Sequence, residues 1–247
     1  MIISYDTDVG RVRKENQDSV FAKQIDENAA LLIVADGMGG HNGGKTASTG
    51  AIESIASKIL QNYYRNMSDE DVEVILREAI AGANSSIYEK SFLNTDLHGM
   101  GTTVVAALIL GDKLYTANVG DSRLYILSNG VLSQVTVDHS YVESLVKKGL
   151  ISKDEARNHP QKNIITRAVG SDDIVDIDIF VNNIAAGDVI LLCSDGLHGA
   201  VSEDDIVSIL GGDINDSAKR LVSAANDNGG RDNISVIVSK ICDEVTI

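Results

Sequence analysis

Three aspartates in the sequence share a local context that suits hard metal ions. Asp36 and Asp195 each end an apolar run and each precede a glycine, and Asp232 lies in a Gly-Gly-Arg-Asp-Asn turn just before the last apolar run. A strand fixes the point from which such a short carboxylate projects, and a glycine lets the chain turn and expose a carbonyl oxygen. Mg²⁺ and Mn²⁺ prefer oxygen ligands of this kind. Asp18 also lies directly before a predicted strand.

Each of these aspartates, taken alone, is more often an ordinary turn residue than a metal ligand. The shared position at strand ends favours metal binding, provided that the folded chain brings the side chains together. Carboxylates that meet repel one another and raise their own pKa values unless cations neutralise them. The residues alone leave two interpretations open, namely separate turns and one metal site.

The elements that must position these aspartates are predicted mainly as strands, from short apolar or alternating runs bounded by Asp, Asn and Gly. The predicted strands are 2–6, 19–25, 31–35, 102–110, 113–118, 123–127, 131–135, 174–181, 188–194 and 234–239. Helices are predicted at 46–64, from Ser68 onward, and at 202–210 and 215–227. Residues 139–170 form a polar insertion that we predict to be mostly helical. Strand clusters interrupted by helix pairs indicate an α+β class, with antiparallel sheets covered by helices.

The composition excludes several classes of protein. The chain has 247 residues, 43% of them hydrophobic, and a formal net charge of −15. Apolar residues spread along the chain argue against disorder, and this length suits one large globular domain, which we predict over residues 1–247. A surface this acidic repels phosphate backbones and anionic lipids, so we predict no nucleic-acid and no membrane partner. Most of the acidic excess is interpreted as a solubility feature.

A cytoplasmic location is predicted from the cysteines and the N-terminus. Cys193 and Cys242 match no metal-ligand spacing, and Cys193 lies in an apolar run, which predicts a buried free thiol. The N-terminus has an acid at Asp6 and no basic segment followed by an apolar stretch. No apolar run approaches the ~20 residues that a membrane-spanning helix needs.

The aspartates lie within a set of motifs that resembles the bacterial branch of the PPM family, the metal-dependent type 2C Ser/Thr phosphatases. The motifs occur in the family's order and cover nearly the whole chain, so the set is far more specific than any one of them. They are DVGRVRKENQD at 8–18, VADGMGGH at 34–41, MGTT at 100–103, VGDSR at 119–123, VDHS at 137–140, EARNHP at 155–160, ITRAVG at 165–170, CSDGL at 193–197 and GGRDN at 229–233.

This resemblance implies a fold and a set of metal ligands. The fold is a four-layer α-β-β-α sandwich, two antiparallel β-sheets flanked by helices, with a metal cleft at one edge. By resemblance, Asp36 bridges two Mn²⁺ or Mg²⁺ ions, and Asp195 and Asp232 are further ligands of one ion. The carbonyl oxygen of Gly37 is the protein ligand of the other. Asp121 and Asp195 resemble a weaker site for a third ion.

The resemblance also implies the reaction. A hydroxide that bridges the two cations would attack phosphoserine or phosphothreonine directly, without a phospho-enzyme. The implied partners are phosphorylated proteins, including a bacterial Ser/Thr kinase that the enzyme opposes and that kinase's substrates. The implied enzyme is a monomer.

Three further residues take catalytic roles in this resemblance. Asp18 matches the family's acid that orients metal-bound water, and Arg13 matches the arginine that grips phosphate oxygens with two N–H groups. His41 matches a general acid that protonates the leaving seryl or threonyl oxygen. On the sequence alone, Arg13 reads as a solvated charge and His41 as a polar loop residue, and the resemblance reverses both interpretations.

Residues 139–170 match the family's flap, a mobile segment beside the cleft that influences substrate access. The flap is locally basic in an acidic protein, which fits either a solvated helix face or substrate steering. Its basic residues are Lys147, Lys148, Lys153, Arg157, Lys162 and Arg167.

The sequence departs from the family pattern at a few positions. Lys45 stands where bacterial relatives commonly have Glu, and His198 stands where Thr is common. Gly199 lacks the acid that animal members use for the third ion. These departures leave open the affinity of the third site, but they remove no ligand of the main pair.

Two other classes of protein compete with an active phosphatase. A pseudophosphatase acting as a binding module typically loses metal-site aspartates, and all are present here. A phosphatase-fold regulator of one dedicated partner often carries a sensor domain, for which we expect no room in this chain. The active enzyme is the favoured interpretation.

Overall fold

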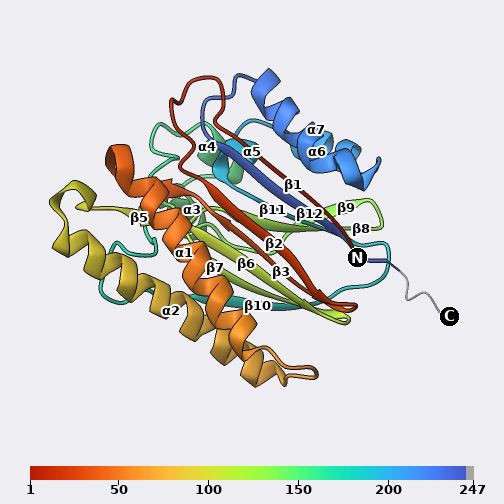
Figure 1. The fold of residues 1–247 in the computed structure, drawn as a ribbon. Coiled ribbons are helices and arrows are strands. Elements are labelled where there is room, and N and C mark those ends of the chain that lie inside the picture. Colours follow the sequence, from red (N-terminus) through yellow and green to blue (C-terminus); the bar gives the residue numbers. More distant parts are fainter. Residues whose placement is uncertain (243–247) are drawn as a thin grey trace.

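In the computed structural model, which describes residues 1–242 apart from the side chains of residues 41 and 42, the strands form two five-stranded antiparallel sheets packed face to face (Figure 1). The first sheet has the order β1 (Ile2–Asp8), β12 (Ile234–Lys240), β11 (Val189–Cys193), β8 (Arg123–Ser128) and β9 (Val131–Gln134). The second has the order β10 (Asp178–Asn183), β7 (Lys113–Val119), β6 (Val104–Leu110), β3 (Ala29–Ala35) and β2 (Ser19–Asp26). A small ladder joins β4 (Gly37–Met38) to β5 (Gly101–Thr102).

Helix pairs cover the outer faces of both sheets. On the second sheet lie α1 (Gly40–Asn62) and α2 (Asp69–Leu93), and on the first lie α6 (Glu203–Leu210) and α7 (Ile214–Asp227), as Figure 1 shows. The arrangement is the predicted four-layer α-β-β-α sandwich. No described helix is long and apolar enough to cross a membrane.

The continuous apolar run before Asp36 is explained by burial on both faces of β3. Leu31 and Ile33 point to the layer of α1 and α2, whereas Leu32 and Val34 point to the layer between the sheets. Both sets are fully buried. A central strand of such a sandwich therefore has no polar face, which is why the run lacks the alternation of a half-exposed strand.

The α2 helix starts where the sequence predicts. Ser68 is its N-cap, and the Ser68 hydroxyl accepts a hydrogen bond from the Asp71 N–H at 3.1 Å. The α1 helix, in contrast, begins at Gly40, six residues before the predicted start. Gly39 precedes it with φ 107°, a conformation that favours glycine.

Two predictions about the insertion and the strand after it were wrong. The flap contains only two short helices, α3 (Tyr141–Lys147) and α4 (Lys153–Arg157), joined by turns, so it is not mostly helical. The strand predicted at 174–181 is β10 at Asp178–Asn183. The backbone before it is bound by α2 instead, since Asn84 donates to the carbonyls of Asp172 and Asp173.

Candidate active site

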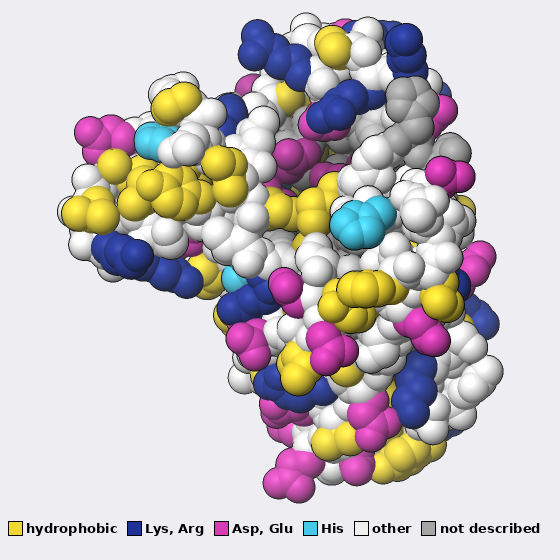
Figure 2. Space-filling view, turned by 90° about the vertical axis from the view of Figure 1, so that its left-hand side faces the viewer, with side chains coloured by type: hydrophobic (Ala, Val, Ile, Leu, Met, Phe, Trp, Pro, Cys, Tyr) yellow, Lys and Arg dark blue, Asp and Glu magenta, His cyan; other side chains and the backbone are white. Residues whose placement is uncertain are grey.

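Strand ends bring five aspartates to one end of the sandwich. Asp36 follows β3, and Asp195 follows β11 as the first residue of α5 (Asp195–His198). Asp121 lies in the turn between β7 and β8, and Asp18 and Asp232 come just before β2 and β12. Figure 2, which looks onto this end, shows acidic side chains recessed beside a projecting lobe. We call the five side chains the acidic cluster. The charge of Asp36 interacts with all four others, so the folded chain brings these side chains close together.

Two threonines hold the backbone of Asp36. Its N–H donates to the Thr103 hydroxyl oxygen at 3.0 Å. Its carbonyl accepts from the Thr103 N–H at 2.8 Å and from the Thr102 hydroxyl at 2.9 Å. The hydroxyl oxygens of Thr103 and Ser122 lie 2.7 Å apart, which joins the strand end of Asp36 to the turn that carries Asp121. This support could not be predicted from the residue types, because hydroxyl residues are common in strands.

Asp18 is the most enclosed member of the acidic cluster, with 1% of its surface exposed. Its Oδ2 accepts the Ser194 hydroxyl at 2.8 Å, and Ser194 Oγ accepts the Ser235 N–H at 3.0 Å. Burial raises the pKa of Asp18 to about 6, although these serines oppose the shift. Its Oδ1 has no hydrogen-bond donor among the described residues. A buried carboxylate oxygen in this position is suited to water or a cation.

Burial and mutual repulsion raise the pKa values of the other cluster members. Burial first, and then the charge of Asp121, raise the pKa of Asp195 to about 8. Burial first, and then Asp138, raise the pKa of Asp121 to about 6. Burial followed by the charges of Asp18 and Asp195 raises the pKa of Asp36 well above its usual value. The protein thus gathers negative charge that bound divalent cations would neutralise.

The donor set fits hard divalent cations. Asp195 Oδ1, like Asp18 Oδ1, is enclosed and lacks a hydrogen-bond donor in the described part of the chain. Carboxylate and carbonyl oxygens are the ligands that Mg²⁺ and Mn²⁺ prefer. Within the same residues, no three Asp, Glu, His or Cys side chains already stand in the geometry of a finished metal site.

Gly37 lies between three backbone segments that leave no room for a side chain. A Cβ at this position would collide with the carbonyl oxygen of Gly44 and would lie 2.6 Å from the carbonyl oxygen of Gln17. Gly37 is buried, and it pairs with Thr102 in the β4–β5 ladder. Its peptide is therefore held directly after Asp36 at the cleft.

Arg13 reaches the acidic cluster from the loop before β2. Its Nη2 lies 2.8 Å from Asp232 Oδ2, and 55% of its side chain is exposed. The hydrogen bond and charge of Asp232 raise the pKa of Arg13, with smaller contributions from Asp195 and Asp36. Arg13 is therefore an exposed cation bound to the acidic cluster, and its phosphate-binding role stays a prediction.

His41 is the second residue of α1, next to the cleft, and its side chain lies outside the described part of the structure. Its role as general acid stays a prediction. The flap, with α3 and α4, forms the projecting lobe on the left of Figure 2 and carries exposed apolar residues beside its basic ones. Those apolar residues are Tyr141, Leu150 and Ile164.

His139 is a positioning residue that the sequence did not reveal beyond its place in a motif. It lies at the base of the flap, 7% exposed, and its Nδ1 accepts the Gly120 N–H at 3.0 Å. Nε2 lies 3.2 Å from Asp178 Oδ2 and 3.0 Å from Arg167 Nη1. Because Nδ1 accepts, the single proton of the neutral ring is on Nε2 and is donated to Asp178, and the Arg167 contact is not a hydrogen bond to this nitrogen. Arg167 binds the other oxygen of Asp178 at 2.8 Å.

We expect His139→Gln to weaken the acid sensitivity of the fold. Burial, aided by Arg167 and Lys147 and opposed by Asp178, lowers the pKa of His139. Its contribution to stability is present above the unfolded pKa of about 6.5 and is lost as pH falls towards the folded pKa. The free energy of unfolding can be measured by urea titration of the chelated protein between pH 7 and 5. As the pH falls, this free energy should decrease by up to ~1.4 kcal/mol per pH unit more in the wild type than in the variant. The matched control is His98→Gln, at an exposed histidine. If the free energy of unfolding depends on pH equally in the wild type and in His139→Gln, the expectation is contradicted.

Comparison with known proteins decides the family. The family model described as Protein phosphatase 2C matches residues 11–236. The chain belongs to the protein phosphatase 2C family. It is 41% identical over 240 residues to the serine/threonine phosphatase stp of Listeria monocytogenes, covering 96% of this chain and 95% of that protein. The predicted bacterial PPM relationship is thereby confirmed.

Solved structures of phosphatase 2C proteins share the fold. The serine/threonine phosphatase Stp1 from Staphylococcus aureus is 36% identical, with a TM-score of 0.91 over 98% of this chain and 95% of that one. The catalytic domain of the serine/threonine protein phosphatase PstP, solved in complex with two manganese ions, is 35% identical, with a TM-score of 0.85 over 98% of both chains.

Proposed function

We propose that this phosphatase 2C protein hydrolyses phosphoserine and phosphothreonine in proteins with the help of divalent cations held by its acidic cluster. One observation carries the proposal: five aspartates from five separate strand ends meet at one cleft, where burial and mutual repulsion raise the pKa values of Asp36 and Asp195. A fold gains no stability from such an arrangement, so the arrangement is best explained by cation binding.

The proposed metal ligands differ in which ion they would hold. Asp36, Asp195, Asp232 and the Gly37 carbonyl would hold two ions, either Mn²⁺ or Mg²⁺, and Asp121 with Asp195 would hold a third, weaker one. When bound, these ions supply a water of lowered pKa and neutralise the charge of the phosphate. The family relationship and the manganese complex of PstP support this assignment.

Three side chains would act on the substrate and on water. Arg13, exposed at the rim, would bind phosphate oxygens with its forked N–H groups. Asp18, with one oxygen held by Ser194 and the other without a donor among described residues, would accept a hydrogen bond from water and orient it. His41 would protonate the leaving oxygen of serine or threonine.

The wider setting follows from the same family relationship. The partners would be phosphorylated proteins, among them a bacterial Ser/Thr kinase and its substrates, and the chain would act as a monomeric domain over residues 1–247 with the flap at 139–170. Cys193 and Cys242 are both free thiols, which suits a reducing, cytoplasmic compartment.

Hydrolysis of p-nitrophenyl phosphate and of a phosphothreonine peptide, each with Mn²⁺, Mg²⁺ or EDTA, tests the proposal. We expect turnover with an added ion, none with EDTA, and a large loss in Asp195→Ala. Turnover that needs no metal would refute the mechanism, as would an undiminished Asp195→Ala enzyme. Failure on every phosphoester despite tight Mn²⁺ binding would favour the binding-module alternative.

A further inference from the structure

The turn that carries Asp121 is held by hydrogen bonds on both sides of that residue. Before it, the carbonyl of Gly120 accepts the His139 N–H at 2.9 Å, and the Gly120 N–H donates to the His139 ring. After it, the carbonyl of Asp121 itself accepts from Nε2 of His198 at 3.1 Å. With the peptides on both sides fixed, the direction in which the Asp121 carboxylate leaves the backbone is fixed as well.

The tautomer of His198 follows from its partner. A carbonyl oxygen only accepts hydrogen bonds, so the ring nitrogen that meets it must carry a hydrogen. Nε2 of His198 therefore carries a hydrogen and donates it to the Asp121 carbonyl.

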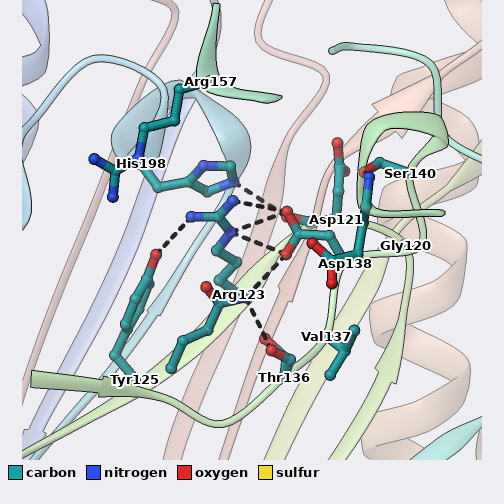
Figure 3. Close-up of polar contacts among 12 residues, drawn as sticks. Gly120, Asp121, Arg123, Tyr125, Thr136, Val137, Asp138, Ser140, Arg157 and His198 are labelled. Atoms are coloured by element: carbon teal, nitrogen blue, oxygen red, sulfur yellow. Dashed lines mark hydrogen bonds and ion pairs between the residues drawn. The ribbon is translucent and has the colours of Figure 1, made fainter. Parts of the chain in front are cut away.

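His198 also belongs to the helix that carries Asp195. Asp195 is the first residue of α5 and His198 the last, three positions later, so the two side chains lie on one side of the helix. Figure 3 shows His198 beside Asp121. Their hydrogen bond therefore connects the helix that begins at Asp195 to the Asp121 turn. The two carboxylates are close enough for the charge of Asp121 to act on Asp195.

The neighbouring arginine does not compete for this carbonyl. Arg123 directs Nε and Nη2 to the Asp138 carboxylate at 2.7 to 3.1 Å, and Nη1 to the Tyr125 hydroxyl at 2.8 Å. Figure 3 shows this network beside the His198 ring. The connection between α5 and the Asp121 carbonyl is thus made by His198.

We propose that His198 is a positioning residue that fixes the spacing of the Asp121 and Asp195 carboxylates for the weaker cation that they would share. This inference rests on the proposed function, and it gives a role to a histidine at a position where the family resemblance leads one to expect threonine. It predicts that the N–H donor of this side chain, rather than its bulk, determines the affinity for that ion.

Calorimetric titration of chelated, dialysed protein with Mn²⁺ tests the inference. In His198→Leu, which removes the donor, we expect the weaker binding phase to lose about 10-fold to 100-fold in affinity, the usual effect of removing a hydrogen-bond partner that orients a metal ligand. The tight phase should not change. His198→Gln, whose amide N–H reaches about as far as Nε2, should restore the weaker phase, whereas the shorter His198→Asn should not.

A double-mutant comparison separates positioning from general damage. Asp121→Asn should remove the weaker phase, and adding His198→Leu to it should cause no further loss in Mn²⁺ binding. The exposed His98→Leu is the control for loss of a histidine. The inference is overturned if His198→Leu and His198→Asn both bind the weaker ion as the wild type does. It is also overturned if His198→Leu lowers the Mn²⁺ affinity further in the Asp121→Asn background. If His198→Leu does not fold, the contrast between His198→Gln and His198→Asn decides.

The proposed function can fail independently of this inference. A wild type that hydrolyses phosphopeptide with Mn²⁺ but shows only the tight phase would overturn the role of His198 and leave the phosphatase proposal standing. A wild type without Mn²⁺-dependent hydrolysis would count against the phosphatase proposal, and its binding isotherms would still decide the role of His198.

Discussion

Asp36→Asn should lower kcat for a phosphothreonine peptide by about a thousandfold. The charge of this side chain interacts with all four other members of the acidic cluster, and the side chain would contact both ions. Losing one unit charge about 4 Å from a cation, at an effective dielectric constant of about 20, costs roughly 4 kcal/mol, and that energy corresponds to ~10³-fold in rate. Steady-state kinetics at saturating Mn²⁺ measures the change.

The same substitution should make the chelated protein more stable. Burial and the neighbouring acids raise the pKa of Asp36, which means that its charged form is disfavoured in the folded state. Asparagine keeps the shape and removes the charge, so thermal unfolding at pH 8 in EDTA should occur at a higher temperature than in the wild type. Each kcal/mol gained raises Tm by about 2–4 °C in a domain of this size.

The opposite signs of these two effects make the test specific. Asp216→Asn removes the same charge from an exposed site on α7 and should change neither activity nor stability appreciably. An Asp36→Asn protein that is both inactive and less stable in EDTA would point to structural damage. An active one would refute the assignment of Asp36 as a metal ligand.

Saturating Mn²⁺ should raise the Tm of the wild-type protein by roughly 10–20 °C over its value in EDTA. A ligand at 100 times its Kd stabilises the folded state by about 2.7 kcal/mol, so two ions contribute about 5 kcal/mol, and the shift follows from the usual 2–4 °C per kcal/mol. Relief of the repulsion within the acidic cluster is the physical source of the gain. Differential scanning calorimetry at fixed ionic strength measures it.

Variants of the acidic cluster provide the control for this stabilisation. Asp195→Ala should lose most of the Mn²⁺-dependent shift, whereas Asp216→Asn should keep all of it. A shift of equal size with Ca²⁺, Mg²⁺ and Mn²⁺ that survives in Asp195→Ala would indicate non-specific screening of the acidic surface instead of a defined site.

Much of the architecture could be predicted because burial leaves a direct mark on the sequence. The run from Leu31 to Ala35 is apolar at every position because β3 is covered on both sides. The strand predicted at 174–181 was misplaced because Ile174 and Val175 look strand-like, while Asn84 and other α2 side chains bind the backbone there. A contact with a residue ~90 positions away leaves no local signal.

Of the candidate site, the aspartates could be predicted from the sequence and the residues that support them could not. Asp18, Asp36, Asp195 and Asp232 can be singled out from their positions at strand ends, whereas Asp121 and the grouping of all five come from the ordered family motifs. Their supports could not be predicted, because Thr103, Ser194 and His198 act through hydrogen bonds to partners distant in the sequence. Nothing about a serine before an Asp-Gly pair indicates that its hydroxyl will meet Asp18.

The 2.7 Å contact between the hydroxyls of Thr103 and Ser122 has a mechanical consequence. Thr103 is also bound to Asp36 through both backbone groups of that residue, so the strand end and the β7–β8 turn form one stiff unit. Thermal displacement of one turn carries the other with it. The distance between the Asp36 and Asp121 backbones should therefore fluctuate less than the position of either one.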